Sequence, residues 1–197
     1  MTCLIAGENY EEQLAPFQEN NMCDCPEEYL DTYSYELETD KDLYWVEFEN
    51  ESQAREHCEK VGVKFDPKNG SWSNSKAKWD WYSVGGRWNG YFTKKPDGYG
   101  KKGVAGFFGL PQDPDPNKVD IVRKGDIDIE TMLAEYNKKA KEENKTENFL
   151  DIIRPFAIIN NGEFIEKYDS KNWVNEFENW WESLSDDTII VAIDYHM

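Results

Sequence analysis

Residues 78–92 read Lys78-Trp79-Asp80-Trp81-Tyr82-Ser83-Val84-Gly85-Gly86-Arg87-Trp88-Asn89-Gly90-Tyr91-Phe92. This central stretch holds three of the eight tryptophans and three of the thirteen glycines of the chain. So much aromatic area is seldom left exposed without a role. The stretch therefore predicts either the packing centre of a domain or a binding surface.

The first half of the central stretch alternates as a β-strand does. We expect one face to carry Trp79, Trp81 and Val84 and the other to carry Asp80 and Tyr82. Gly85 and Gly86 should end the strand, because glycine tolerates positive φ and bulges. Arg87 would then emerge beside Trp88, where a guanidinium can stack on an indole.

Two interpretations of the central stretch stay open. In the first, aromatic rings, an arginine and glycine amides form a pocket for a nucleotide or another phosphorylated ligand. Its residues would be Trp79, Asp80, Trp81, Tyr82, Gly85, Gly86, Arg87 and Trp88. In the second, Arg87 pairs internally with Asp80 and the tryptophans belong to the core.

Elsewhere the chain mixes strand and helix patterns without regular alternation. Strands are expected at residues 3–6, 44–48, 119–122 and 188–193, with helices at 9–14, 52–60, 130–143 and 173–184. Residues 156–165 predict a hairpin with Asn160-Asn161-Gly162 at its turn. Residues 20–42 are read as loop with some helix. The fold class is therefore α+β, with a largely antiparallel sheet and helices mainly on one face.

Length and charge limit the possible roles of the chain. Its 197 residues predict one domain, 1–197, with a basic glycine-rich loop region at about 94–118. The formal net charge is −18. Residues 1–70 and 126–197 are acidic, at −13 and −10, whereas residues 71–125 carry +5. Acidic flanks repel nucleic acid and anionic membranes and suit a basic partner, although they also simply favour solubility.

No familiar enzyme signature is present. The sequence contains no phosphate loop and none of the motifs GxGxxG, HExxH and GxSxG, so no cofactor is predicted. We expect no signal peptide and no membrane span, and hence a cytosolic protein with reduced thiols. Cys23, Cys25, His57 and Cys58 are spaced poorly for zinc.

Two acidic segments offer weaker candidate sites. Asp194 and His196 would share one face of a strand and could act as a base with its orienting acid, or as metal ligands. Asp126 and Asp128 could bind a divalent cation, but acids at such positions more often cap the helix that follows.

Four motifs in order carry a resemblance that spans nearly the whole chain. They are Ile5-Ala6-Gly7-Glu8-Asn9-Tyr10-Glu11-Glu12-Gln13-Leu14-Ala15-Pro16-Phe17, the central stretch, Lys124-Gly125-Asp126-Ile127-Asp128 and Asp194-Tyr195-His196. Together they resemble a family of phage-linked proteins without an assigned activity. The family's first strand often holds a histidine and an aromatic residue, whereas this strand reads Met1-Thr2-Cys3-Leu4. The resemblance implies a phage-linked context, in which acidic accessory proteins often block host machinery.

Three functional hypotheses follow. The leading one is a non-catalytic protein of the host bacterial cytosol that inhibits a basic, nucleic-acid-binding host protein by acidic mimicry, as an anti-defence or anti-CRISPR protein. It would contact its partner through acids such as Glu27, Glu28 and Asp31, without binding nucleic acid or membrane itself. The second is a nucleotide sink or sensor built on the central stretch. The third is a hydrolase or nucleotide-modifying enzyme using Asp80, Arg87, Asp126, Asp194 and His196.

Overall fold

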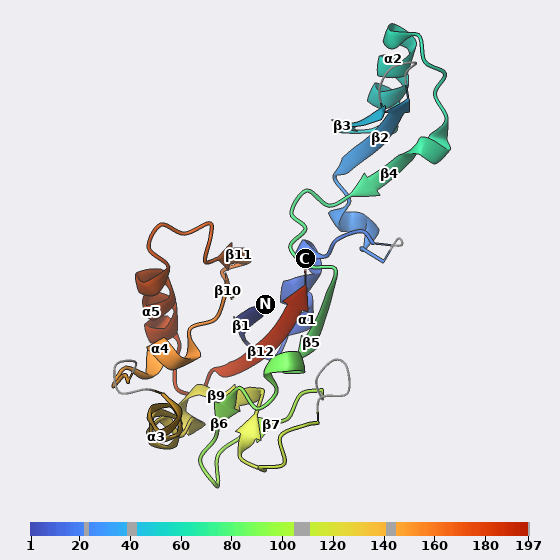
Figure 1. Cartoon of the computed structure of the whole chain (residues 1–197). Helices are drawn as coiled ribbons and strands as arrows, with labels where there is room; N and C mark the ends of the chain where they lie inside the picture. The colour runs from blue at the N-terminus through green and yellow to red at the C-terminus, as the bar shows by residue number, and fades with distance from the viewer. Residues whose placement is uncertain (22–23, 39–42, 105–110, 141–144, 197) are drawn as a thin grey trace. The chain divides into compact units, whose positions relative to one another are not determined.

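The computed structural model describes residues 1–21, 24–38, 43–104, 111–140 and 145–196. The chain divides into two compact units (Figure 1). Unit 1 comprises residues 1–13 and 81–197, and unit 2 comprises residues 14–80. The boundary at residues 80 and 81 passes through the central stretch. The expectation that all 197 residues behave as one domain stays a prediction.

Unit 1 is built on a mixed sheet in the order β11-β10-β1-β12-β9-β7, with β5 also paired to β12. Its strands are β1 (Thr2–Ala6), β5 (Trp81–Val84), β7 (Gly100–Lys101), β9 (Ile121–Arg123), β10 (Ala157–Asn160), β11 (Glu163–Glu166) and β12 (Ile189–His196). The pairs are antiparallel except β1 with β10. A separate antiparallel pair joins β6 (Phe92–Thr93) to β8 (Lys118–Val119).

Strand β12 is the centre of this sheet. It pairs with β1 on one side, while on the other β9 covers its first residues and β5 its last. Residues 190–195 are all buried, which explains the continuous apolar run that predicts a central strand. This arrangement places Asp194 opposite Ser83 of β5 and so brings the end of the chain to the central stretch.

Helices α3 (Ile129–Lys139), α4 (Phe149–Ile153) and α5 (Trp173–Ser183) of unit 1 share a core with the sheet. Unit 1 also has short 3-10 turns at η4 (Gly86–Trp88) and η6 (Lys124–Asp126), and α1 (Tyr10–Leu14) crosses the boundary between the units. The buried face of α5 presents Trp173, Phe177, Trp180 and Trp181. These side chains share one core with Met132 of α3, Phe149 and Ile153 of α4, and Leu4, Ile158, Ile190 and Ala192 of the sheet. Each such buried side chain contributes about 1.5–3 kcal/mol.

Unit 2 is a three-stranded antiparallel sheet with one α-helix against it (Figure 1). Its strands lie in the order β3 (Leu43–Phe48), β2 (Thr32–Glu38) and β4 (Gly70–Ser73), and its α-helix is α2 (Glu51–Val61). Its 3-10 turns are η1 (Ala15–Phe17), η2 (Glu27–Tyr29) and η3 (Pro67–Asn69). Tyr33, Tyr35 and Leu37 of β2 pack with Ala54 and Cys58 of α2.

The α+β class with a largely antiparallel sheet is confirmed. So is the hairpin β10–β11, whose turn residues Asn161 and Gly162 both have positive φ, as a two-residue turn of this type requires. Asp128 caps α3 by accepting a hydrogen bond from the Thr131 amide, which is the helix-capping alternative for this acid. Asn50 caps the start of α2, because its side chain accepts a hydrogen bond from the Gln53 amide.

Two local expectations were wrong. Residues 32–38, read as loop, form β2, because Tyr33, Tyr35 and Leu37 alternate with polar residues and pack on α2. Val84 shares a face with Tyr82 rather than Trp81, because successive residues of β5 (Trp81–Val84) point to opposite faces of the sheet. Within the glycine-rich region at 94–118, Gly100 and Lys101 form β7, which pairs with β9. Residues 105–110 lie outside the described residues, and the loop region as a whole stays a prediction.

Candidate functional site

Two buried carboxylates pack directly against Gly85 and Gly86. Both glycines have positive φ, 77° and 53°. A Cβ atom at Gly85 would lie 2.6 Å from Cγ of Asp120, and one at Gly86 would lie 2.6 Å from Cβ of Asp194. Conformation and close approach both require glycine here, since any side chain would displace a carboxylate.

Arg87 holds Asp194 through three hydrogen bonds. Its amide and Nε donate to Oδ2 at 2.9 and 2.7 Å, and Nη2 donates to Oδ1 at 2.5 Å. The Asp194 side chain is fully buried, whereas that of Arg87 is 41% exposed. Burial alone would raise the pKa of Asp194, but the hydrogen bonds from Arg87 outweigh it and lower that pKa. Arg87 therefore pairs internally, as the second interpretation of the central stretch predicts. Its partner is Asp194, whereas the sequence analysis suggested Asp80.

Asp120 was not among the sequence candidates, yet it organises the loops around the glycines. Oδ1 accepts from the amides of Gly90 and Tyr91 at 2.7 and 3.1 Å, and Oδ2 accepts from the amide of Gly103 at 2.9 Å. Burial raises the pKa of Asp120 in spite of these hydrogen bonds. Backbone amides in this region thus bind the carboxylates of Asp120 and Asp194. The first interpretation of the central stretch had such amides bind the phosphate of a ligand.

A ring cluster lies beside the Arg87–Asp194 pair. The rings of Trp81 and His196 stack with centroids 5.8 Å apart and planes 4° from parallel. Cζ of Arg87 lies 5.7 Å from the centroid of Trp81, within cation–π range. Trp88 is 49% exposed. Arg87, Trp81, Asp194 and His196 therefore come together in unit 1, and Trp88 follows Arg87 in η4.

The other predicted residues of the central stretch are Tyr82 in unit 1 and Trp79 and Asp80 in unit 2. Tyr82 occupies the opposite face of β5 from Trp81. Trp79 and Asp80 belong to unit 2, where the Trp79 ring is buried and its Nε1 donates to the Leu14 carbonyl oxygen at 3.0 Å. The ligand pocket proposed for the whole stretch stays a prediction.

The other candidate sites have structural partners. Asp126 accepts a hydrogen bond from the Tyr99 amide and pairs with Arg123. Cys25 and Cys58 are buried free thiols, and Cys23 lies outside the described residues. Within the described ranges, no group of three or more His, Cys, Asp and Glu side chains is placed to hold a metal ion.

Unit 2 presents an open sheet face that the sequence analysis missed. Because Tyr33, Tyr35 and Leu37 face α2, the alternate positions of β2 and their cross-strand neighbours face the other way. Trp45 lies opposite Glu36, and Leu43 lies opposite Glu38. Trp45 and Leu43 are 60% and 62% exposed. We call this the acidic sheet face; its residues are Thr32, Ser34, Glu36, Glu38, Leu43, Trp45, Glu47, Ser71 and Ser73.

A pocket of about 270 Å³ lies at the end of the acidic sheet face. It is lined by Asp31, Thr32, Glu47, Phe48, Glu49 and Gln53, so it contains three carboxylates and no basic side chain. Asp31 accepts hydrogen bonds from the Ser75 hydroxyl and amide at 2.6 and 2.8 Å, which lower its pKa and keep it ionised. Glu27 and Glu28 are exposed in η2. Of the three predicted partner-binding acids, Asp31 lines this pocket.

No protein-family model, curated protein or solved structure matches the chain. Among the described residues, no helix is both long and apolar enough to cross a membrane.

Proposed function

We propose that this protein binds a basic surface of a host protein through the acidic sheet face and so blocks access of nucleic acid to that surface. The observation that carries the proposal is an exposed tryptophan and leucine set among glutamates, beside a pocket lined by three carboxylates. An exposed Trp supplies the apolar anchor typical of interfaces. The carboxylates of Asp31, Glu47 and Glu49 fit an inserted lysine or arginine.

Charge supports this assignment of partner. Unit 2 has 16 acidic and 7 basic side chains, a net charge of −9 in 67 residues. A surface that evolved to bind phosphates carries dense positive charge, and a field of the opposite sign speeds encounter with it. The phage-linked resemblance makes host defence effectors that bind nucleic acid, CRISPR effectors among them, the first partners to test. The protein then acts by occupancy, as an anti-defence inhibitor, without catalysis.

The test uses a panel of purified, nucleic-acid-free host effectors of this kind. We expect at least one to bind the protein, and expect nucleic acid to compete with that binding. Trp45→Ala should weaken the complex without unfolding the protein, because this side chain is mostly exposed. A panel without binders, or binding that persists when the nucleic-acid site is filled, would remove the proposal.

The two alternative functions, a nucleotide sink or sensor and an enzyme, have less structural support. A nucleotide sink at the central stretch would use Arg87, but Nε and Nη2 of that side chain already hold Asp194. An enzyme would need Asp126 in the same cleft as His196, whereas Asp126 is bound to Tyr99 and Arg123. Fluorescence titration with a nucleotide panel tests the sink directly.

A further inference from the structure

Strand β3 is an edge strand of the sheet in unit 2 (Figure 1). Within the described residues it pairs with β2 alone, in continuous register and without a bulge. It contains no lysine and no proline, the residues that commonly block such edges. Its large side chains Leu43, Tyr44 and Trp45 are exposed. An unblocked apolar edge of this kind can accept another strand. We call it the open edge.

The opposite edge of the same sheet is covered by the chain itself. It is formed by β4, which has four residues. The Asn20 side chain donates to the Trp72 carbonyl oxygen of β4 at 2.6 Å. In the described ranges, no side chain makes a comparable hydrogen bond to the backbone of β3. The open edge is therefore the side of this sheet at which a further strand can pair.

Hydrogen bonds in the sheet show which way each backbone segment faces. Successive residues of an antiparallel strand direct their N–H and C=O groups to alternate sides. The Ser73 hydroxyl donates to the Thr32 carbonyl oxygen at 3.3 Å, so the backbone of Thr32 faces β4. The backbone of Tyr33 then faces β3, and that of its partner Phe48 faces β2.

The same alternation along β3 assigns the groups at the open edge. The backbones of Leu43, Trp45 and Glu47 point outwards. The Glu49 amide agrees with this assignment, because it donates to the Gln53 side chain at 3.1 Å and not to β2. The three outward-facing residues also carry their side chains on the acidic sheet face. A strand at the open edge would therefore lie beside that face.

We propose that an extended, basic segment of the partner pairs with the open edge as a fourth, antiparallel strand of this sheet. The inference rests on the proposed function, because it specifies how the partner meets the acidic sheet face. The existing pairs of the sheet are antiparallel, and strand addition of this kind is a known mode of peptide recognition. Residues of the segment opposite Trp45 and Glu47 would place their side chains on the acidic sheet face.

The chemistry on either side of β3 defines the segment. Glu47 lines the pocket of about 270 Å³ together with Asp31 and Glu49, so a lysine or arginine opposite Glu47 gains charge-assisted contacts there. On the other side of the sheet, Val46 and Phe48 pack against the core that includes α2. Apolar residues fit beside them. The segment should therefore alternate basic and apolar residues.

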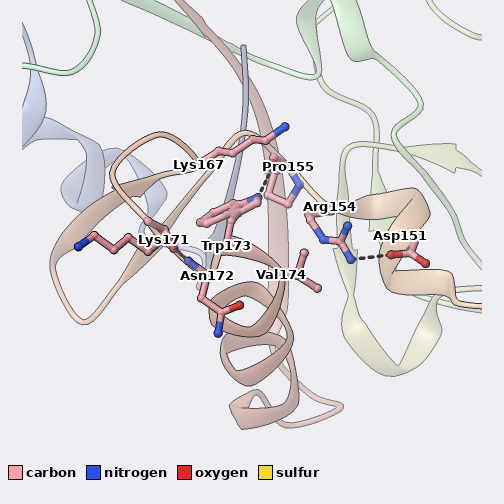
Figure 2. Close-up of a pocket in the computed structure, with 9 residues that line it drawn as sticks. Asp151, Arg154, Pro155, Lys167, Lys171, Asn172, Trp173 and Val174 are labelled. Atoms are coloured by element: carbon pink, nitrogen blue, oxygen red, sulfur yellow. Dashed lines mark hydrogen bonds and ion pairs between the residues drawn. The ribbon is translucent and has the colours of Figure 1, made fainter.

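Two other arrangements fit less well. The larger pocket in unit 1, of about 510 Å³, has Asp151, Arg154, Lys167 and Lys171 as its charged lining residues. Figure 2 shows Arg154 already bonded to Asp151, at 2.6 Å. The excess of cations there repels a basic segment. A second copy of the chain at the open edge would bring together two units of net charge −9, which also repel each other.

The probe is a synthetic peptide of alternating lysine and valine, about seven residues long, which spans the six residues of β3. It is added to the isotope-labelled full chain, and amide hydrogen exchange is followed by NMR. Exchange should slow at least about tenfold at Leu43, Trp45 and Glu47, because these amides gain acceptors. Tyr44 and Val46 should change little, since their amides already bond to β2. Slowing without this alternation, or no slowing, would overturn the proposal.

Two isomers of the peptide, methylated on backbone nitrogens, supply a control of equal charge. Methyl groups on the lysine amides block the bonds to β3, whereas methyl groups on the valine amides point away from it. The first isomer should bind at least about tenfold more weakly than the second. Glu47→Gln/Glu49→Gln should also weaken binding of the unmodified peptide, and Glu56→Gln/Glu59→Gln on α2 should not. Equal binding by the two isomers would exclude strand pairing.

The outcomes separate this inference from the proposed function. An effector that binds the acidic sheet face without slowing exchange at the outward amides overturns strand pairing and leaves inhibition standing. Alternating protection by the peptide, with a panel that contains no binding effector, supports strand pairing and removes inhibition. Sedimentation of the free chain should show a monomer. Self-association that protects the outward amides would assign the open edge to a second copy and overturn the proposal.

Discussion

Arg87 and Asp194, 107 positions apart in the sequence, form a two-point ion pair with N–O distances of 2.7 and 2.5 Å. The pair fastens the segment after β5 to the central strand β12. It also explains why Gly86 precedes Arg87, since the Asp194 side chain occupies the space of a Cβ atom. The arginine of the Gly-Gly-Arg motif thus forms an internal ion pair, which we call the Arg87–Asp194 clamp. Its exposed parts are Trp88 and the outer side of Arg87.

Removing one member of the clamp should destabilise unit 1. Arg87→Ala removes the guanidinium from a fully buried carboxylate, which keeps only the backbone amide of residue 87 and the Met1 amino group at 3.5 Å, and we expect a loss of about 3 kcal/mol in the free energy of unfolding. Asp194→Asn should cost a similar amount, and the double variant less than the sum, by at least about 1 kcal/mol. Denaturant unfolding measures all three. Asp151→Asn, which breaks the more exposed pair with Arg154, serves as control at about 0.5 kcal/mol. Additive losses would contradict the clamp.

The clamp also predicts a dependence on pH. Because Arg87 lowers the pKa of Asp194 in the folded state, this carboxylate stabilises the protein above its ordinary pKa of about 4. That stability is lost as pH falls through the lowered value. The raised pKa of Asp120 has the opposite effect, because its contribution to the free energy of unfolding increases as pH falls. The difference in unfolding free energy between the wild type and Asp194→Asn should therefore be constant from pH 7 to about 5 and shrink below about 4. A constant difference down to pH 2 would disprove the linkage.

Gly86 and Gly162 separate conformational strain from close packing. Both have positive φ, but a Cβ atom at Gly162 meets nothing within 4 Å. Gly162→Ala should cost about 1 kcal/mol of unfolding free energy. Gly86→Ala should cost at least about 3 kcal/mol, because it also displaces Asp194 from its position against the strand. Thermal unfolding of the two variants measures the difference. Equal shifts in Tm would show that the carboxylate does not pack as described.

The acidic sheet face predicts which charge reversals affect binding. With an effector identified from the panel, Glu36→Lys/Glu47→Lys should weaken the complex about tenfold or more and flatten its salt dependence. Glu56→Lys/Glu59→Lys makes the same change in net charge on α2, which packs on the other face, and should leave affinity nearly unchanged. Calorimetry between 50 and about 300 mM salt measures both. If the two variants lose affinity equally, net charge rather than this face controls binding.

Much of the fold follows from local patterns in the sequence. The apolar run at 188–193 indicates a central strand, the Asn-Gly turn indicates the β10–β11 hairpin, and the aromatic spacing after Trp173 indicates α5. Asp128 ahead of α3 acts as the expected cap. These features are visible because their causes act over a few residues: side-chain period, turn conformation and capping.

The partners of the buried charges and the exposed face of unit 2 depend on contacts between distant segments. Nothing near Arg87 in the sequence identifies Asp194 as its partner, because their meeting depends on the register of β5 against β12. No sequence motif marks Asp120, because the groups that donate hydrogen bonds to it are backbone amides from two separate loops. The alternation of Tyr33, Tyr35 and Leu37 could have revealed β2, but only its packing on α2 shows that Trp45 points the other way. Sequence periodicity specifies which residues can share a face, whereas burial of one face against a helix selects the face that is left for a partner.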